Sequence, residues 1–332
     1  MRKITMMLLV LFVLVSVSSV FAGGRGARDD GVRVMRAACN QPDGYPTVVG
    51  LQAMADYVYR ATNGRIVIQV FNNAVLGQET ESVMLTQMGE IEFNRLGVGF
   101  LASVNPQIGA FAMPGLYRDR EHMFRVLNSP IGDEALMMME AQGLIGLAWM
   151  DAGFRNFYNR LRPVRVPADI AGMNIRMQPV EMMMRLAETL GINPVSASMG
   201  EVYTIIQTGM VDGAENNWPS YASWSHYEVA RYFTVNRHNA SPEMILISAS
   251  VYRSLSPEDR AIIRRGALHG GRVQQEEWIR YEAAAEARVR AAGSVIIVPT
   301  PEEQRLWDEA IAPMHALYPQ FAGIISRIRA IP

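Results

Sequence analysis

Short apolar segments alternate with segments of helical spacing along the first half of the chain. Four apolar segments predict strands, at residues 32–38, 65–71, 91–98 and 144–150. Four segments with apolar residues three and four apart predict helices, at residues 45–62, 79–88, 119–127 and 131–142. Strands that are separated by helices tend to pair in parallel, so this half predicts an α/β lobe with a mostly parallel sheet.

The second half of the chain repeats this alternation. Strands are predicted at residues 155–159, 173–177, 212–215, 233–238, 244–248 and 295–298. Helices are predicted at residues 180–190, 200–207 and 221–232, and closing helices at residues 301–331. We expect the strands at 233–238 and 244–248 to return to the first lobe. Two lobes that the chain crosses between more than once predict a cleft between them, where small ligands bind.

One helix is expected to be much longer than the others. It begins at Ser256, which can cap the helix, and Pro257 fits the first helical position. Glu258 and Asp259 place acids in the first turn, which the helix dipole favours. The helical pattern runs to about residue 292, longer than most globular helices, so the helix could lie across both lobes.

The N-terminus has the pattern of a secretory signal. Arg2 and Lys3 precede an apolar run at residues 4–15, and residues 16–22 end in small side chains. We expect cleavage after Ala22, which makes the mature protein exported and periplasmic. Residues 23–30 are rich in glycine and charge and predict a disordered lead-in.

Composition narrows the class of protein. The formal net charge is −1, and it becomes −3 once Arg2 and Lys3 are removed, which argues against nucleic acid as a partner. Cys39 is the only cysteine, so no disulfide within the chain is possible. Lys3 is the only lysine, so the mature chain has no amine side chain for a Schiff base. About 300 residues remain, enough for two domains with cores of their own.

The usual signatures of catalysis and cofactor binding are missing from the sequence. The five histidines are not spaced as metal ligands, and no Gly-x-Ser-x-Gly elbow occurs. No Gly-x-Gly-x-x-Gly motif follows a strand, and Gly97-Val98-Gly99 is only a fragment of one. We therefore expect neither a metal nor a cofactor, and these absences make an enzyme less favoured.

Two arginines stand at strand positions in the middle of the chain. Arg155 lies in the strand at 155–159, and Arg176 lies near the end of the strand at 173–177. A buried arginine costs free energy unless an anion meets it, and its planar fork matches a carboxylate with two bonds. This pattern predicts that the chain binds a small organic acid.

Five motifs then resemble one family along nearly the whole mature chain. They are LGQETE at 76–81, GLYRDREH at 115–122, GFRN at 153–156, IAGMNIR at 170–176, and MGEVYTIIQTGMVDGAEN at 199–216. In this order they resemble the solute-binding proteins of TRAP (tripartite ATP-independent periplasmic) transporters. The resemblance implies a two-lobed periplasmic-binding-protein-like fold that closes on an organic acid and hands it to the membrane permease subunits. It also implies that the protein is not an enzyme.

The same resemblance implies the lobe boundaries and the site. The first lobe would comprise residues 31–152 and 241–280, and the second lobe residues 153–240 and 281–332. Arg176 would make the main carboxylate contact, assisted by Arg155 and Asn216. The first lobe would add groups from the loop at 40–45, from Glu79 and from a strand end. The full set of expected ligand contacts is Arg176, Arg155, Asn216, Glu79, Arg95, Asn40, Gln41, Tyr45, Asn94, Gln178, Asn217, Tyr221 and His238.

The stretches NNWPSY at 216–221 and FNR at 93–95 look most like the subgroup that binds hexuronates such as glucuronate and galacturonate. Asparagine and glutamate side chains can hydrogen-bond the hydroxyls of a sugar ring. One departure lies at Asn40-Gln41-Pro42, where related proteins often carry histidine before the proline. The alternatives are a dicarboxylate, keto acid or aldonate as ligand, an exported sugar-acid lyase or isomerase, and a partner of a membrane sensor.

Structural roles are also open for several of these residues. Arg95 could pair with Glu92 or Glu90, and Glu79 could simply be favoured at a helix start. Asn216 could turn the chain, and His238 could be a hydrogen-bonded core histidine.

Overall fold

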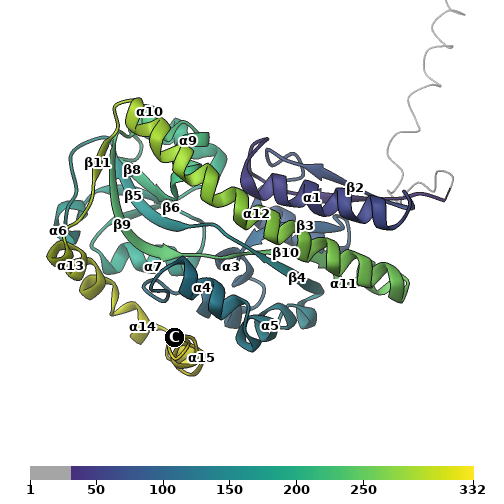
Figure 1. Cartoon of the computed structure of the whole chain (residues 1–332). Helices are drawn as coiled ribbons and strands as arrows, with labels where there is room; N and C mark the ends of the chain where they lie inside the picture. The colour runs from purple at the N-terminus through teal and green to yellow at the C-terminus, as the bar shows by residue number, and fades with distance from the viewer. Residues whose placement is uncertain (1–30) are drawn as a thin grey trace, which may run out of the picture.

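A computed structural model describes residues 31–332 as two α/β lobes joined by connecting strands and by one long helix (Figure 1). The predicted signal peptide at residues 1–22 and the lead-in at residues 23–30 lie outside the described residues.

The first lobe is built on a five-stranded sheet of order β2-β1-β3-β10-β4. Its strands are β1 (Arg33–Ala38), β2 (Ile66–Phe71), β3 (Phe93–Gly97), β4 (Leu144–Met150) and β10 (Glu243–Ser248). β1 pairs in parallel with β2 and β3, whereas β10 runs antiparallel to β3 and β4. β10 is the strand that enters this sheet from the other lobe.

The second lobe is built on a six-stranded sheet of order β11-β9-β5-β8-β6-β7. Its strands are β5 (Phe154–Asn159), β6 (Asn174–Met177), β7 (Asn193–Ser196), β8 (Gly213–Asn216), β9 (Tyr232–Ala240) and β11 (Val295–Ile297). β5, which enters from the first lobe, runs antiparallel to β8 and β9. The chain therefore crosses between the sheets at residues 151–153 and again at residues 241–242.

Helices cover the two sheets. Those before the first crossing are α1 (Pro46–Ala61), α2 (Glu79–Met88), α3 (Val98–Leu101), η1 (Pro106–Ala112), α4 (Arg120–Leu127), α5 (Pro130–Met137) and η2 (Glu140–Gln142). Those of the second block are α6 (Pro167–Ile170), α7 (Glu181–Thr189), η3 (Met199–Glu201), α8 (Val202–Gln207), α9 (Trp218–Ser223) and α10 (His226–Val229). The last part contains α11 (Ala249–Arg253), α12 (Pro257–Ala291), α13 (Pro301–Ile311), α14 (Met314–Leu317), η4 (Pro319–Phe321) and α15 (Ala322–Arg329).

Strand β10 shows why the first sheet is buried on both faces. Ile245 and Ile247 belong to the core under α1 and α12, while Met244 and Leu246 belong to the core on the other face. Successive side chains of a strand point to opposite faces, so a run without polar alternation fits a sheet covered on both sides.

The long helix α12 is confirmed at 35 residues. The Ser256 side chain accepts a hydrogen bond from the Asp259 amide at 3.0 Å, as its predicted capping role requires. α12 packs along α1 and β4 in the first lobe and reaches α9 in the second (Figure 1). It therefore spans both lobes.

The contact between α1 and α12 depends on two glycines. A Cβ atom at Gly270 would lie 2.5 Å from the carbonyl oxygen of Gly50, and one at Gly50 would lie 2.8 Å from the carbonyl oxygen of Gly270. The absence of side chains at both positions lets the two backbones approach this closely.

The sheets are mostly parallel, as predicted, and each contains one antiparallel strand that enters from the other lobe: β10 in the first sheet and β5 in the second. Two predictions of local structure are wrong. The helix predicted at 221–232 is instead α9 and α10. Asn217 caps α9 by accepting from the Ser220 amide, and Ser225 adopts a left-handed φ of 56° between the two helices. The strand predicted at 233–238 stays in the second sheet as part of β9, and only β10 returns.

The C-terminal segment contacts α4 and α5, the helices that lie between β3 and β4 in the chain. Arg327 on α15 donates to both carboxylate oxygens of Glu134 on α5, each at 2.8 Å. The His122 ring on α4 lies 3.2 Å from the carbonyl oxygen of Ile328. Earlier in the same segment, α13 packs on β9 and α14 packs on α7 in the second lobe, so the C-terminal segment touches both lobes. The lobe boundaries proposed from the sequence stay a prediction.

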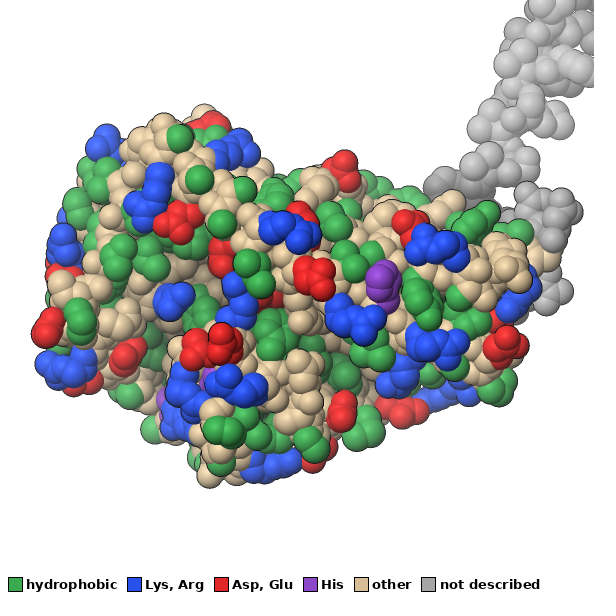
Figure 2. All heavy atoms as spheres, in the orientation of Figure 1, with side chains coloured by type: hydrophobic (Ala, Val, Ile, Leu, Met, Phe, Trp, Pro, Cys, Tyr) green, Lys and Arg blue, Asp and Glu red, His purple; other side chains and the backbone are tan. Residues whose placement is uncertain are grey.

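Acidic and basic side chains are interspersed over the face shown in Figure 2, with no extended patch of one sign. Such a surface lacks the basic stripe that nucleic-acid binding requires. Within residues 31–332, no helix combines the length and the apolar character needed to cross a membrane.

Candidate ligand-binding site

A small cavity of about 30 Å³ lies between the lobes, where the strand ends of both sheets meet the crossing segments. This volume holds about one water molecule. The residues that line it are Asn40, Gln41, Glu79, Gly97, Ala152, Arg155, Arg176, Gln178, Met199, Asn216, Asn217, Ser220, Ser241 and Glu243. A six-carbon sugar acid needs several times this volume, so the lobes must separate or the lining side chains must move before such a ligand can enter.

Arg176 is the cation of this cavity that lacks a carboxylate partner. Its side chain is buried on β6, and its Nε donates to the carbonyl oxygen of Ala197 at 2.8 Å. Among residues 31–332 neither Nη atom has a hydrogen-bond partner and no carboxylate forms an ion pair with Arg176. Burial lowers the pKa of Arg176, and the pull of Glu215 only partly opposes this effect. Burying a guanidinium without a counter-ion costs free energy, and an anion that entered the cavity would reduce that cost.

Arg155 lies on β5, which β8 separates from β6, and it already has a partner. Its Nε and Nη2 both donate to the carboxylate of Glu215 on β8, and Nη2 also donates to the Glu215 carbonyl oxygen at 3.0 Å. Burial alone would raise the pKa of Glu215, but Arg155 outweighs it and the pKa falls to about 2. Arg155 lines the cavity as one half of an internal ion pair.

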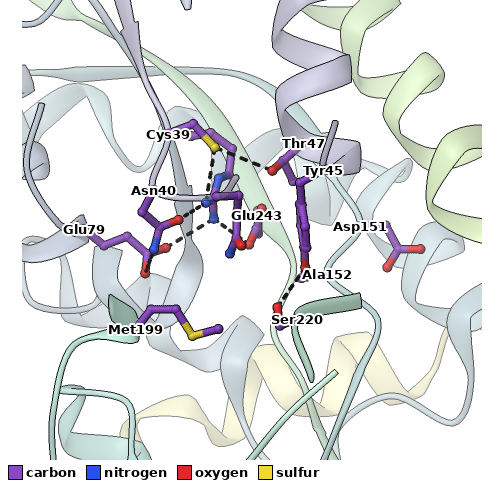
Figure 3. Close-up of polar contacts among 12 residues, drawn as sticks. Cys39, Asn40, Tyr45, Thr47, Glu79, Asp151, Ala152, Met199, Ser220 and Glu243 are labelled. Atoms are coloured by element: carbon purple, nitrogen blue, oxygen red, sulfur yellow. Dashed lines mark hydrogen bonds and ion pairs between the residues drawn. The ribbon is translucent and has the colours of Figure 1, made fainter. Parts of the chain in front are cut away.

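The first lobe contributes a cluster around Arg95. Arg95 Nη1 donates to Glu243 at 2.7 Å and to Glu79 at 3.2 Å, and Nη2 donates to the side-chain oxygen of Asn40. The Asn40 amide in turn donates to Glu79 at 3.1 Å (Figure 3). Burial raises the pKa of Glu79 and raises that of Glu243 to about 7, in both cases against the opposing effect of Arg95. Arg95 therefore lies behind the cavity, where it donates hydrogen bonds to the two carboxyl groups that line it, those of Glu79 and Glu243.

The amide side chains of the site are partly occupied by the protein. The Asn216 amide donates to the sulfur of Met199 at 3.4 Å, and its oxygen accepts from the Asn217 amide nitrogen at 2.9 Å. The Asn217 side chain donates to the carbonyl oxygen of Ala152 in the first crossing segment at 2.8 Å. Gln41 accepts from the Trp224 ring nitrogen at 3.1 Å, which links the lobes.

Five residues expected to touch the ligand do not line the cavity. Arg95 lies behind it, and Tyr45 bonds Ser220 and Asn217 beside it. Asn94 donates to Thr86 inside the first lobe at 3.0 Å. Tyr221 donates to the Ala230 carbonyl in an aromatic core, and His238 stacks on Phe157 behind Glu215. The polar atoms of Asn94, Tyr221 and His238 bond within the interior of a lobe, and a direct contact of these residues with the ligand stays a prediction.

Sequence reasoning missed several lining residues. Gly97, Ala152, Met199, Ser220 and Ser241 line the cavity but were not expected as ligand contacts, although Met199 and Ser220 lie within the quoted motifs. Glu243 did carry a signal: it is an acid at the start of the otherwise apolar strand β10, directly after Pro242.

The described residues contain no group of histidine, cysteine, aspartate and glutamate side chains suited to hold a metal ion. The cavity instead offers cations, carboxyl groups and amides, a set that recognises an acid bearing hydroxyl groups.

Comparison with known proteins agrees with this geometry. Residues 37–320 match the family described as bacterial extracellular solute-binding protein, family 7. The chain belongs to this family of solute-binding proteins. Its members bind solutes for transport, so the protein is a binding protein and not an enzyme.

Individual members are also similar. A solute-binding protein of Chromohalobacter salexigens is 31% identical over 252 residues, which cover 76% of this chain and 75% of that protein. A TRAP periplasmic solute-binding protein from Roseobacter denitrificans, solved with β-D-glucuronate, is 32% identical with a TM-score of 0.87. One from Xanthobacter autotrophicus, solved with β-D-galacturonate, is 36% identical with a TM-score of 0.86. Each of these two structures covers 90% of this chain and is itself covered completely.

Proposed function

We propose that this family 7 protein captures a hexuronate, such as glucuronate or galacturonate, between its lobes and delivers it to the membrane subunits of a TRAP transporter. The single observation that carries the proposal is the buried guanidinium of Arg176, which lines the interlobe cavity without a carboxylate partner among residues 31–332. A ligand carboxylate would supply the missing anion with two charge-assisted hydrogen bonds.

The remaining lining groups suit the hydroxylated part of such a ligand. Asn40, Glu79, Asn216 and Gln178 offer donors and acceptors around the cavity, as a sugar ring requires. The ligand would bind when the lobes are apart and would favour closure by contacting both walls, so that binding shifts the population toward the closed form. The bound uronates of similar structures support the same ligand class.

Calorimetric titration of the purified mature protein with galacturonate and glucuronate tests this proposal. We expect one site per chain, and we expect Arg176→Ala to weaken binding by about 100-fold or more, since each bond to a charged group contributes ~1.5–3 kcal/mol. Arg185→Ala is the matched control, because Arg185 is an exposed arginine of the same lobe that pairs with Glu188. Unchanged affinity in Arg176→Ala would contradict the assignment.

Delivery to a permease needs a separate test. We propose that residues 1–22 direct export and that the mature protein works in the periplasm. Deletion of the gene for this protein, or of the genes for the TRAP membrane subunits of the same organism, should abolish uptake of labelled galacturonate by whole cells. Uptake that persists in both deletions would assign the protein another role.

A further inference from the structure

The two walls of the cavity differ in charge. On the second-lobe side, Arg155 is neutralised by Glu215, and Arg176 remains as a positive charge without a counter-ion among the described residues. On the first-lobe side, two carboxyl groups share one guanidinium, because both Glu243 and Glu79 accept from Nη1 of Arg95. The second-lobe wall therefore has a cation, Arg176, without a carboxylate partner among residues 31–332. The first-lobe wall has no unpaired cation among its described residues, because Arg95 is already bonded to Glu79 and Glu243.

The oxygens of the first-lobe wall are arranged to receive donors. Oε2 of Glu243 is buried and has no hydrogen-bond partner among residues 31–332. Glu79 faces the same cavity, and its Oε2 accepts only from Asn40 (Figure 3). When the glutamates are ionised, a ligand hydroxyl can donate to such oxygens, whereas a ligand carboxylate has no proton to donate.

We propose that Glu79 and Glu243 determine specificity by admitting acids that carry one carboxylate and a hydroxylated far end, and by excluding dicarboxylates. This inference rests on the proposed function, since it assumes that a ligand carboxylate sits on Arg176. A second carboxylate at the other end of the ligand would be buried against the two glutamates, with Arg95 already paired. A buried charge without a partner is costly, so the diacid should bind more weakly.

Comparison of three six-carbon acids of the same sugar series measures the effect of a second carboxylate on affinity. Galacturonate and galactonate have one carboxylate, and galactarate has one at each end. By calorimetry at about pH 8, where Glu243 with its pKa of about 7 is mostly ionised, we expect galactarate to bind the wild-type protein at least about tenfold more weakly than galacturonate. Glu243→Gln and Glu79→Gln each remove one carboxylate and leave Arg95 partly unpaired, so each should raise galactarate affinity relative to galacturonate by about fivefold or more.

Glu92→Gln is the matched control. Glu92 pairs with Arg36 beside the same sheet at 3.2 Å but does not line the cavity, so the ratio of the affinities should stay at its wild-type value. Melting curves establish which variants fold. If Glu243→Gln does not fold, Glu79→Gln alone provides the test. Galactonate shows whether an open-chain monoacid binds more tightly than galactarate, as the inference requires.

The outcomes separate this inference from the proposed function. Binding of none of these acids would overturn both. Tight binding of galacturonate together with equally tight binding of galactarate would overturn the inference alone. An affinity ratio that stays the same in both glutamine variants would also overturn it, because the glutamates would then not be the groups that discriminate.

Discussion

Arg155 and Glu215 form a buried ion pair across the adjacent antiparallel strands β5 and β8, with two guanidinium nitrogens donating to the carboxylate. The pair lies one strand away from Arg176, which is on the far side of β8. The two arginines thus differ in the fold, because Glu215 neutralises only Arg155. This difference supports the proposal that a ligand carboxylate binds at Arg176 rather than at Arg155.

Removal of the negative charge at Glu215 should destabilise the protein strongly. Glu215→Gln leaves Arg155 buried without a counter-ion, and the loss of one partner of a buried pair costs about 3–5 kcal/mol. Glu303→Gln breaks the exposed Arg165–Glu303 pair and should cost less than about 1 kcal/mol. Urea denaturation of both variants checks this, and similar losses in the two would contradict a special role for the buried pair.

The carboxyl group of Glu243 should make stability depend on pH. Burial raises its pKa from the ordinary 4.5 to about 7, against the pull of Arg95 and with a further rise from Glu79. Between these two values the folded protein holds a proton that the unfolded chain has lost. The stabilising contribution of this carboxyl group to the free energy of unfolding is therefore present below about pH 4.5 and is lost as the pH rises through about 7.

Glu243→Gln should remove that dependence, because glutamine does not titrate. The stability of the variant relative to the wild type should rise by on the order of 2 kcal/mol between about pH 5 and about pH 8. Buried Asp151, whose pKa burial raises to about 6, is present in both proteins, so most of its pH dependence cancels in the difference. Urea titrations at a series of pH values provide the measurement, and a difference that does not change with pH would refute the prediction.

A buried hydrogen bond between the lobes should contribute to ligand affinity. The Tyr45 hydroxyl at the start of α1 lies 2.9 Å from Ser220 Oγ on α9 (Figure 3). If closure forms this bond, Tyr45→Phe should weaken galacturonate binding by about three- to tenfold, as expected for ~1 kcal/mol. Tyr117→Phe is the control, since Tyr117 donates to the Phe111 carbonyl within one lobe. Equal affinity in the wild type and Tyr45→Phe would mean that the bond persists in the open form.

The close approach of α1 and α12 gives a prediction opposite to helix propensity. Alanine favours a helix over glycine by about 1 kcal/mol, yet Gly270→Ala would place a methyl group 2.5 Å from the backbone of α1. We expect a loss of about 1–3 kcal/mol, because the backbone cannot move aside as a side chain could. Gly323→Ala in α15 meets nothing within 4 Å and should be neutral or slightly stabilising. Thermal melting of both variants measures this difference, and an unchanged melting temperature in Gly270→Ala would contradict the prediction.

The local sequence determined most elements and the class of site. The segment at 144–150 is buried throughout and is a strand from end to end, and Ser256 with Pro257 starts α12 as predicted. These features depend on near neighbours in the chain. The family motifs likewise identified the solute-binding family that the comparison shows.

Only the tertiary structure decided which charges are neutralised. Glu215, Glu243 and Arg95 come from three different strands, so no spacing in the sequence shows that Glu215 takes Arg155 and that Arg95 holds two carboxyl groups. The placement of Asn94, Tyr221 and His238 in lobe interiors also depends on long-range packing. The family motifs in the sequence predicted Arg176 as the main carboxylate contact, and the fold showed that Glu215 pairs with Arg155 and leaves Arg176 without a carboxylate among the described residues, because burial and pairing are properties of the assembled lobes.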